Sequence, residues 1–247
     1  MRVDGVLFDI DDTLVDTRGA FGHALAGVAR RYLPDLPVDR HAELVTVWRA
    51  DVGGHYAAYT RGEVGYAEQR MARANELHER FGGPALDADG FARWDETFEA
   101  EFSGAWSAHP DVDAVVDRLL AAGLVVGALS NAAVAYQTRK LDRAALLERV
   151  PMLVGVDTLG FGKPDPRVFV EACHRLGTDP TRTVYVGDEL DVDARAAVAA
   201  GLVGVWLDRP GERRIPVSPE DLAGARQAGV RVIASLAELP GVLGIEE

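Results

Sequence analysis

The hydrophobic pattern of this 247-residue chain changes near residue 107. Between residues 18 and 106, aromatic and aliphatic side chains recur every three to four positions, which is the period of an amphipathic helix. Such stretches lie around residues 21–32, 44–52, 64–81 and 91–102. Aromatic side chains at this spacing are typical of the core of a helical bundle, so we predict a helical domain here.

From residue 109 onward, short apolar strands alternate with helical stretches, and one further strand precedes the helical block. The predicted strands are residues 3–8, 124–129, 152–156, 183–186 and 204–207, and the predicted helices are 112–122, 133–141, 167–176 and 194–200. This alternation indicates a parallel sheet covered on both faces. We therefore predict an α/β fold, with a doubly wound parallel-sheet core at 1–17 and 107–247 and an inserted helical domain at 18–106.

Charge and composition exclude some classes of function. The net charge of −13 argues against nucleic acid or an anionic membrane as a partner, although it does not exclude a small anionic substrate. Cys173 is the single cysteine, so no internal disulfide can form and a reducing compartment is expected. The N-terminal apolar stretch is too short for a secretion signal, and the other apolar runs are too short to span a bilayer. We expect a cytoplasmic protein.

Polar side chains follow the predicted strands, where ligands bind in open parallel sheets. They are Asp9 and Asp11 after the first strand, Ser130 and Asn131 after the second, Lys163 in the loop after the third, and Asp188 after the fourth. Two acids two positions apart suit either a nucleophile beside a proton donor or ligands for a hard cation. Together with a hydroxyl and a lysine, they fit phosphoryl chemistry. Each residue alone also has a structural interpretation, such as a helix cap for Ser130.

The order of these residues resembles the haloacid dehalogenase-like hydrolase superfamily over nearly the whole chain. Its four motifs are matched by Asp9, Asp11 and Thr13 (D-x-D-x-T), by Ser130, by Lys163 before a proline, and by Gly187-Asp188 with Asp193. The inserted block resembles the C1 cap of subfamily I, in its phosphatase branch. Two departures are Asp12, where the superfamily often has glycine, and an extra acid, Asp191. Spacing to Gly201 favours Asp193 over Asp191 as the motif residue.

This resemblance implies a Mg²⁺-dependent phosphatase acting on a small phosphorylated metabolite. Asp9 would attack phosphorus to form an aspartyl-phosphate, and Asp11 would protonate the leaving group and then activate water. Mg²⁺ would be held by the carboxylates of Asp9 and Asp188 and by the backbone carbonyl of Asp11. The phosphate would be held by Ser130, Lys163 and the N–H of Asn131. Thr13 and Asp193 would support these groups without contacting the metal directly.

Substrate selection is expected in the inserted domain. The candidates are Arg18, Arg49, Tyr56 and Tyr59, with His55 and Arg70 also considered. For each of them an ordinary surface or packing role is favoured over substrate contact. Three alternatives to a phosphatase stay open: a 2-haloacid dehalogenase, a phosphomutase and a catalytically silent binding protein. Asp11 argues against the dehalogenase, which lacks an acid at that position, and the intact motifs argue against the silent protein.

Overall fold

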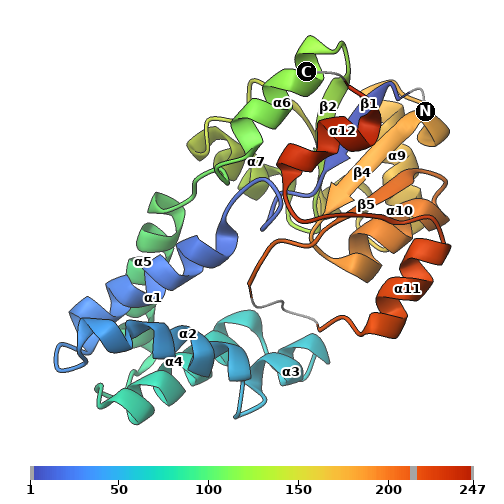
Figure 1. Cartoon of the computed structure of the whole chain (residues 1–247). Helices are drawn as coiled ribbons and strands as arrows, with labels where there is room; N and C mark the ends of the chain where they lie inside the picture. Colours follow the sequence, from blue (N-terminus) through green and yellow to red (C-terminus); the bar gives the residue numbers. More distant parts are fainter. Residues whose placement is uncertain (1–2, 212–215, 246–247) are drawn as a thin grey trace. The chain divides into compact units, whose positions relative to one another are not determined.

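The computed structural model describes residues 3–211 and 216–245, and the chain divides into two compact units (Figure 1). Unit 1 comprises Met1–Asp16 and Ser107–Glu247, and unit 2 comprises Thr17–Trp106. The chain thus leaves unit 1 after its first strand, builds unit 2, and returns.

Within the described residues, unit 1 is built on a six-stranded sheet in the order β3-β2-β1-β4-β5-β6. The strands are β1 (Gly5–Phe8), β2 (Val125–Leu129), β3 (Met152–Val154), β4 (Thr183–Gly187), β5 (Val203–Leu207) and β6 (Arg231–Ile233). Every neighbouring pair is parallel. The strand order reverses between β1 and β4, which is the position where open α/β sheets bind ligands. The predicted α/β fold class is confirmed.

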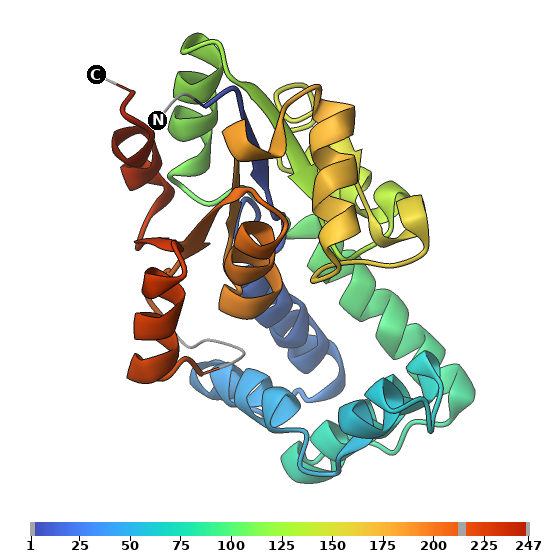
Figure 2. The same ribbon diagram turned by 90° about the vertical axis from the view of Figure 1, so that its right-hand side faces the viewer.

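Helices cover both faces of this sheet, as Figure 2 shows for α9 on one side and α6 and α12 on the other. The helices of unit 1 are α6 (Val112–Ala121), α7 (Val134–Arg143), α8 (Val156–Leu159), α9 (Pro166–Leu176), α10 (Ala196–Ala199), α11 (Pro219–Gln227) and α12 (Leu239–Leu243). On the α9 face, Leu7, Phe169 and Tyr185 belong to one buried cluster. Helix α9 begins with Asp165, whose side chain accepts a hydrogen bond from Arg167 N–H, and ends at Gly177 in the left-handed region.

The sequence pattern missed or misplaced several elements of unit 1. Strand β6 and helices α11 and α12 were not predicted, because β6 has three residues, α12 has five, and α11 buries only Ala225 and so shows little apolar period. The predicted strand at 152–156 ends at Val154, since Gly155 caps helix α8. The predicted helix at 194–200 is a π-helical turn over Leu190–Arg195 followed by α10.

Unit 2 consists of helices α1 (Thr17–Tyr32), α2 (His41–Ala50), α3 (His55–Thr60), α4 (Tyr66–Phe81) and α5 (Ala88–Gly104). Where the pattern predicted one helix from Leu44 to near Arg61, the chain breaks at Asp51, whose φ of 45° is left-handed, and α3 follows as a separate helix. The core of unit 2 is formed by the aromatic side chains that the sequence predicted to pack there. The rings of Trp94 and Phe98 stack with centroids 5.7 Å apart, and Trp48 stacks on Trp94 at 5.9 Å.

Hydrogen bonds within unit 1 anchor the segments that lead to and from unit 2. The N–H of Asp16 donates to the carbonyl of Ser107 at 3.0 Å, and the N–H of His109 donates to the carbonyl of Leu14 at 3.0 Å. Nearby, Arg209 binds the carboxylate of Asp111 through two nitrogens, at 2.8 and 2.9 Å. These contacts tie the loop after β1 to the returning chain.

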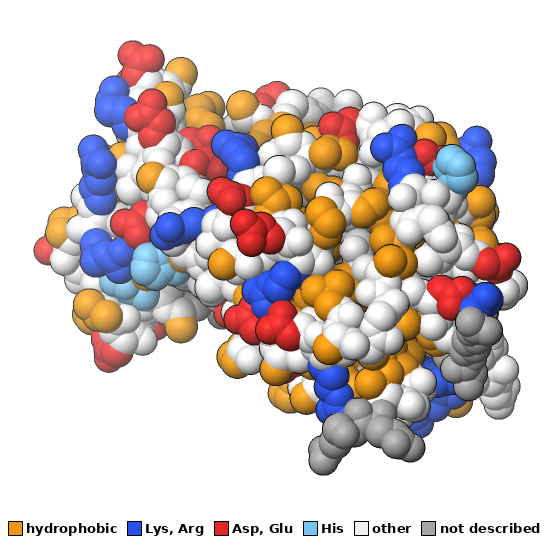
Figure 3. Space-filling view, turned by 90° about the horizontal axis from the view of Figure 1, so that it is seen from above, with side chains coloured by type: hydrophobic (Ala, Val, Ile, Leu, Met, Phe, Trp, Pro, Cys, Tyr) orange, Lys and Arg blue, Asp and Glu red, His pale blue; other side chains and the backbone are white. Residues whose placement is uncertain are grey.

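No helix among residues 3–211 and 216–245 is both long and apolar enough to cross a membrane. On the face shown in Figure 3, acidic and basic side chains are interspersed.

Candidate functional site

The site is built on the carboxyl end of β1, where the chain turns sharply. Asp9 continues the sheet ladder, with its N–H donating to the carbonyl of Val186 at 2.8 Å. The next residues form a tight turn in which the N–H groups of Leu14 and Val15 both donate to the carbonyl of Ile10, at 3.0 and 2.9 Å. Asp9 is buried, whereas the side chain of Asp11 is 37% exposed. The two carboxylates therefore have different environments although they are two residues apart.

Lys163 lies at the centre of the buried part of the site. Its Nζ donates to Asp9 Oδ1 at 2.8 Å, to Asp193 Oδ1 at 2.7 Å and to Tyr185 Oη at 2.7 Å. An ammonium group has three N–H donors, so these three oxygens use all of them. The tyrosine hydroxyl in turn donates to the carbonyl of Leu129 at 3.0 Å, which links the end of β2 and the middle of β4 to this lysine.

Burial and neighbouring charge act in opposite directions on these groups. Burial raises the pKa of Asp9, the ammonium of Lys163 opposes this, and the nearby carboxylates of Asp193 and Asp11 add to the rise. Burial by itself would lower the pKa of Lys163, but Asp193 and Asp9 together raise it above its ordinary value. Lys163 is therefore cationic at neutral pH. On balance the pKa of Asp9 is raised to about 7, and Lys163 is the main group that limits this rise.

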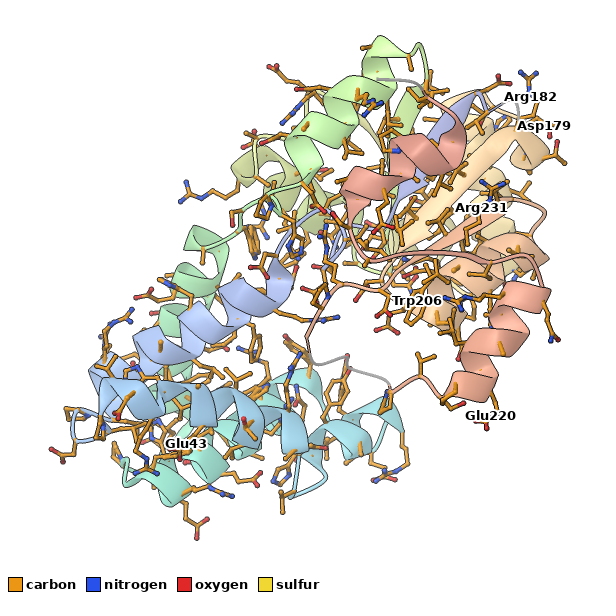
Figure 4. The ribbon with its side chains drawn as sticks, in the orientation of Figure 1. Glu43, Asp179, Arg182, Trp206, Glu220 and Arg231 are labelled. Carbon is orange, nitrogen blue, oxygen red and sulfur yellow. The ribbon has the colours of Figure 1, made fainter. Side chains whose placement is uncertain are left out.

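Three acids converge beside this lysine. Ligand oxygens of Asp9, Asp188 and Asp193 all lie within 4.8 Å of one another. Asp188 follows β4 and its carbonyl accepts a hydrogen bond from the indole N–H of Trp206 at 2.9 Å; Trp206 is labelled on β5 in Figure 4. Three carboxylates and one ammonium leave a net negative charge, and hard oxygen donors are the ligands that Mg²⁺ prefers. The residues present therefore fit a divalent cation.

A second group of ligand atoms, from Asp12, Asp16 and His109, also lies within 4.8 Å. It includes an imidazole, which suits softer metals better than Mg²⁺.

The structure distinguishes the two acids that the sequence left as alternatives. Asp193 is buried, and its carboxylate accepts hydrogen bonds from Lys163 Nζ and from Glu189 N–H, the latter at 2.9 Å. Asp191 is exposed and pairs with Arg195 at 2.6 Å. Gly187 leaves room for the side chain of Asp193, because a Cβ at position 187 would lie 2.3 Å from Asp193 Cγ.

The loops after β2 and β3 are joined through Asn131. Its side-chain amide donates to the carbonyl of Lys163 at 2.8 Å, and its Oδ1 accepts from the N–H of Lys163 at 2.6 Å. Gly162 permits this approach, since a Cβ there would lie 2.2 Å from Asn131 Oδ1. Ser130 is buried, and its Oγ accepts from the N–H of Ala132 at 3.3 Å. Thr13 is fully buried, and its carbonyl accepts a hydrogen bond from Arg209 at 3.0 Å.

Three further residues at the site were not among the candidates named from the sequence. Tyr185 lies in the middle of an apolar strand, where an aromatic residue is usually read as packing. Gln137 and Lys140 lie on α7 and are fully or nearly fully buried, with Lys140 paired to Asp11. What marks them is burial, which only the structure gives: the buried residues of α7 are Gln137, Lys140 and Leu141. A helix that directs two polar side chains inward needs partners for them.

The four substrate-selection candidates all lie in unit 2. Arg18 is on α1, Arg49 is exposed on α2, and Tyr56 and Tyr59 are on α3 with ring centroids 6.1 Å apart. Their contact with a substrate stays a prediction.

Two other side chains considered in unit 2 have partners within that unit. Arg70 is buried, pairs with Asp95, and lies 4.6 Å above the ring of Phe98, which is a packing role. His55 lies 4.0 Å from Glu76 on α4.

Comparison with known proteins identifies the family. A family model described as haloacid dehalogenase-like hydrolase matches residues 3–201. The chain belongs to the haloacid dehalogenase-like hydrolases. It is 31% identical to the phosphoserine phosphatase of Thermus thermophilus over 233 residues, covering 88% of this chain and 93% of that protein. It is 29% identical to the glyceraldehyde 3-phosphate phosphatase of Methanopyrus kandleri over 208 residues, covering 84% of each.

Solved structures agree on the fold of this hydrolase. The magnesium-bound HAD-hydrolase YfnB of Bacillus subtilis matches with a TM-score of 0.72 at 22% identity, over 99% of this chain and 100% of that one. A HAD family hydrolase of Deinococcus radiodurans, solved with bound phosphate and sodium, matches with a TM-score of 0.69 at 24% identity, over 98% and 96% of the two chains.

Proposed function

We propose that this hydrolase is a Mg²⁺-dependent phosphatase that cleaves a small phosphomonoester through an aspartyl-phosphate on Asp9. The observation that carries the proposal is the pairing of each acid with its own lysine: Asp9 with Lys163, and Asp11 with Lys140. One acid is buried and the other is partly exposed, so the two carboxylates have different environments, which suits separate roles as nucleophile and as acid and base. The relatives named as phosphatases support the same reaction class.

In the first step, a carboxylate oxygen of Asp9 attacks phosphorus as the bond from phosphorus to the ester oxygen breaks. The electron pair goes to the departing oxygen, which takes a proton from Asp11 and leaves as an alcohol. In the second step, water attacks the phosphorus of the aspartyl-phosphate and gives a proton to Asp11. The bond from phosphorus to Asp9 breaks, which restores the carboxylate and releases inorganic phosphate.

Mg²⁺ would be held by the carboxylates of Asp9 and Asp188 and by the backbone carbonyl of Asp11. When bound, it would reduce repulsion between the Asp9 carboxylate and the phosphate oxygens and stabilise the charge that develops on the phosphoryl group. Asp193 would hold Lys163 in place, as its hydrogen bond suggests.

The phosphate oxygens would be held by Ser130, the N–H of Asn131 and Lys163. Because all three donors of Lys163 have acceptors, a phosphate oxygen would replace one of them, or share an N–H with it.

Substrate selection would lie in unit 2, the inserted domain predicted at residues 18–106, which we propose is the cap. Arg18, Arg49, Tyr56 and Tyr59 are its candidate contacts. Substituting a side chain that touches the natural ester should change kcat/KM for that ester far more than for para-nitrophenyl phosphate.

Phosphate release from para-nitrophenyl phosphate, phosphoserine, phosphoglycolate and glyceraldehyde 3-phosphate tests the proposal, with Mg²⁺ and after exhaustive chelation. We expect release with Mg²⁺ only. Asp9→Asn should abolish turnover, because a neutral amide cannot form the acyl-phosphate, and Asp191→Asn is the matched control on an exposed acid. Undiminished release after chelation would exclude the metal role, and near-normal turnover of Asp9→Asn would exclude the nucleophile.

A further inference from the structure

Both oxygens of the Asp11 carboxylate are held by side chains from one helix, α7. Lys140 Nζ contacts Oδ1, and Gln137 Nε2 donates to Oδ2 at 2.6 Å. The two residues are three positions apart, so they lie on the same face of α7. Gln137 is fully buried and Lys140 is 2% exposed.

Burying these two side chains is costly unless they find partners, because a desolvated ammonium or amide loses its bonds to water. Asp11, whose own side chain is 37% exposed, accepts from Lys140 Nζ and Gln137 Nε2, whereas the buried Oε1 of Gln137 has no hydrogen-bond partner among the described residues. The carboxylate of Asp11 is thus held by two buried side chains, Gln137 and Lys140. The backbone of the turn after β1 sets the position of the residue itself. Such an arrangement restricts the rotation of a short carboxylate side chain.

Gln137 makes a second bond, from Nε2 to Ser130 Oγ at 2.8 Å. Ser130 ends β2 and is proposed above to hold a phosphate oxygen. One amide nitrogen therefore bridges the proposed proton donor and the proposed phosphate-binding hydroxyl. Gln137 therefore contacts both groups at once, while the backbone at the end of β2 and in the turn after β1 sets where they lie.

We propose that Gln137 and Lys140 are positioning residues that hold the Asp11 carboxylate where it delivers a proton to the departing oxygen. This inference rests on the proposed function, since it assigns a purpose to Asp11 within that reaction. General acid catalysis depends steeply on geometry, and a displacement of about 1 Å can cost roughly a hundredfold in rate. The benefit should depend on how strongly the leaving oxygen needs a proton.

Two esters of similar shape separate this role from a merely structural one. Phenyl phosphate releases a basic phenolate that needs a proton, whereas para-nitrophenyl phosphate releases a much weaker base that does not. The quantity to measure is kcat/KM, because it reports the steps up to departure of the leaving group and is insensitive to slow hydrolysis of the aspartyl-phosphate.

We expect Lys140→Met and Gln137→Met each to lower kcat/KM for phenyl phosphate by about tenfold or more and for para-nitrophenyl phosphate by less than about threefold. Arg139→Met, which removes an exposed cation from the same helix, should leave both values unchanged. In an Asp11→Asn background, Lys140→Met should add little further loss, because the acid it positions is already absent.

The outcomes are distinguishable. Equal losses on the two esters, or a full extra loss in the Asp11→Asn background, would overturn the positioning role while leaving the phosphatase intact. A wild-type protein that hydrolyses neither ester would overturn the proposed function and this inference together. If Lys140→Met does not fold, as judged by its thermal unfolding, Gln137→Met alone decides the question by the same ratio.

Discussion

Replacing Lys163 with methionine should destabilise the fold, because it removes the cation that two buried carboxylates share. Methionine has nearly the same length and shape, so the change deletes the charge with little loss of packing. The side chains of Lys163, Asp9 and Asp193 are only 3%, 10% and 1% exposed. Water therefore cannot replace the lost ammonium at either acid without opening the site.

The magnitude follows from the cost of breaking a buried ion pair by removing one partner, which is about 3–5 kcal/mol. Lys163 has two carboxylate partners, so we expect a loss toward the upper end of that range. Total stabilities of about 5–15 kcal/mol are typical of folded domains, so a measurable folded population is expected. Bound Mg²⁺ would offset part of the lost positive charge, and the loss should be smaller when it is present.

The assay is urea unfolding at pH 7 in a chelator, repeated with Mg²⁺. Lys163 lowers the pKa of Asp9 against the effect of burial, so removing it leaves that pKa further raised. Some carboxyl groups have a higher pKa in the folded protein than in the unfolded chain. Such a group stabilises the fold at a pH below its pKa in the unfolded chain, and this contribution is lost as the pH rises through its pKa in the folded protein. The deficit of the variant should therefore shrink as the pH is lowered toward 5 and grow as the pH rises through about 7, which is the pKa of Asp9 in the wild-type fold.

A double variant makes the reasoning refutable. Adding Asp193→Asn to Lys163→Met removes one uncompensated charge, so the double variant should be more stable than Lys163→Met alone. Arg139→Met, which deletes an exposed cation, should stay within about 0.5 kcal/mol of wild type. A cost below about 1 kcal/mol in chelator, or a double variant less stable than Lys163→Met, would show that the ammonium does not compensate these acids.

Three further changes test other parts of unit 1. Burial alone would raise the pKa of Asp111, but hydrogen bonds from Arg209 and Ser235 lower it to about 2. The ionised acid should therefore add about 2 kcal/mol to the free energy of unfolding above pH 4, and this contribution is lost as the pH falls toward 2. In urea unfolding, the difference in stability between wild type and Asp111→Asn should therefore become smaller at acid pH. Gly162→Ala should lower stability and activity by displacing Asn131, whereas Gly104→Ala, where no atom lies within 4 Å of the added carbon, should not affect unfolding or turnover. Asp11→Asn should lower kcat about 10²–10⁴-fold. It should keep its affinity for Mg²⁺, because the proposed metal contact of Asp11 is the backbone carbonyl. A fall in kcat of less than about threefold, or a loss of Mg²⁺ affinity measured by calorimetry, would contradict the role proposed for Asp11.

The sequence alone determined the layers of the fold and the edge of the sheet where the candidate site lies. Apolar strands alternating with helices imply a parallel sheet, and parallel strands place all their carboxyl ends at one edge. Asp9, Ser130 and Asp188 could therefore be assigned to one place without coordinates, because each directly follows a strand. The helical pattern of residues 18–106 could likewise be read locally, since its aromatic period is that of a helix.

Tertiary structure alone decided which side chains complete the site. Tyr185 reads as packing in a strand and Lys140 as an exposed helix lysine, because a local pattern records periodicity and not the partner across the sheet. The burial of Lys140 depends on Asp11, which lies 129 positions away in the chain. Spacing to Gly201 already favoured Asp193 over Asp191, and the structure adds the close approach to Gly187 and the hydrogen bond from the buried ammonium of Lys163. These are long-range electrostatic and steric constraints, so they exist only once the chain has folded.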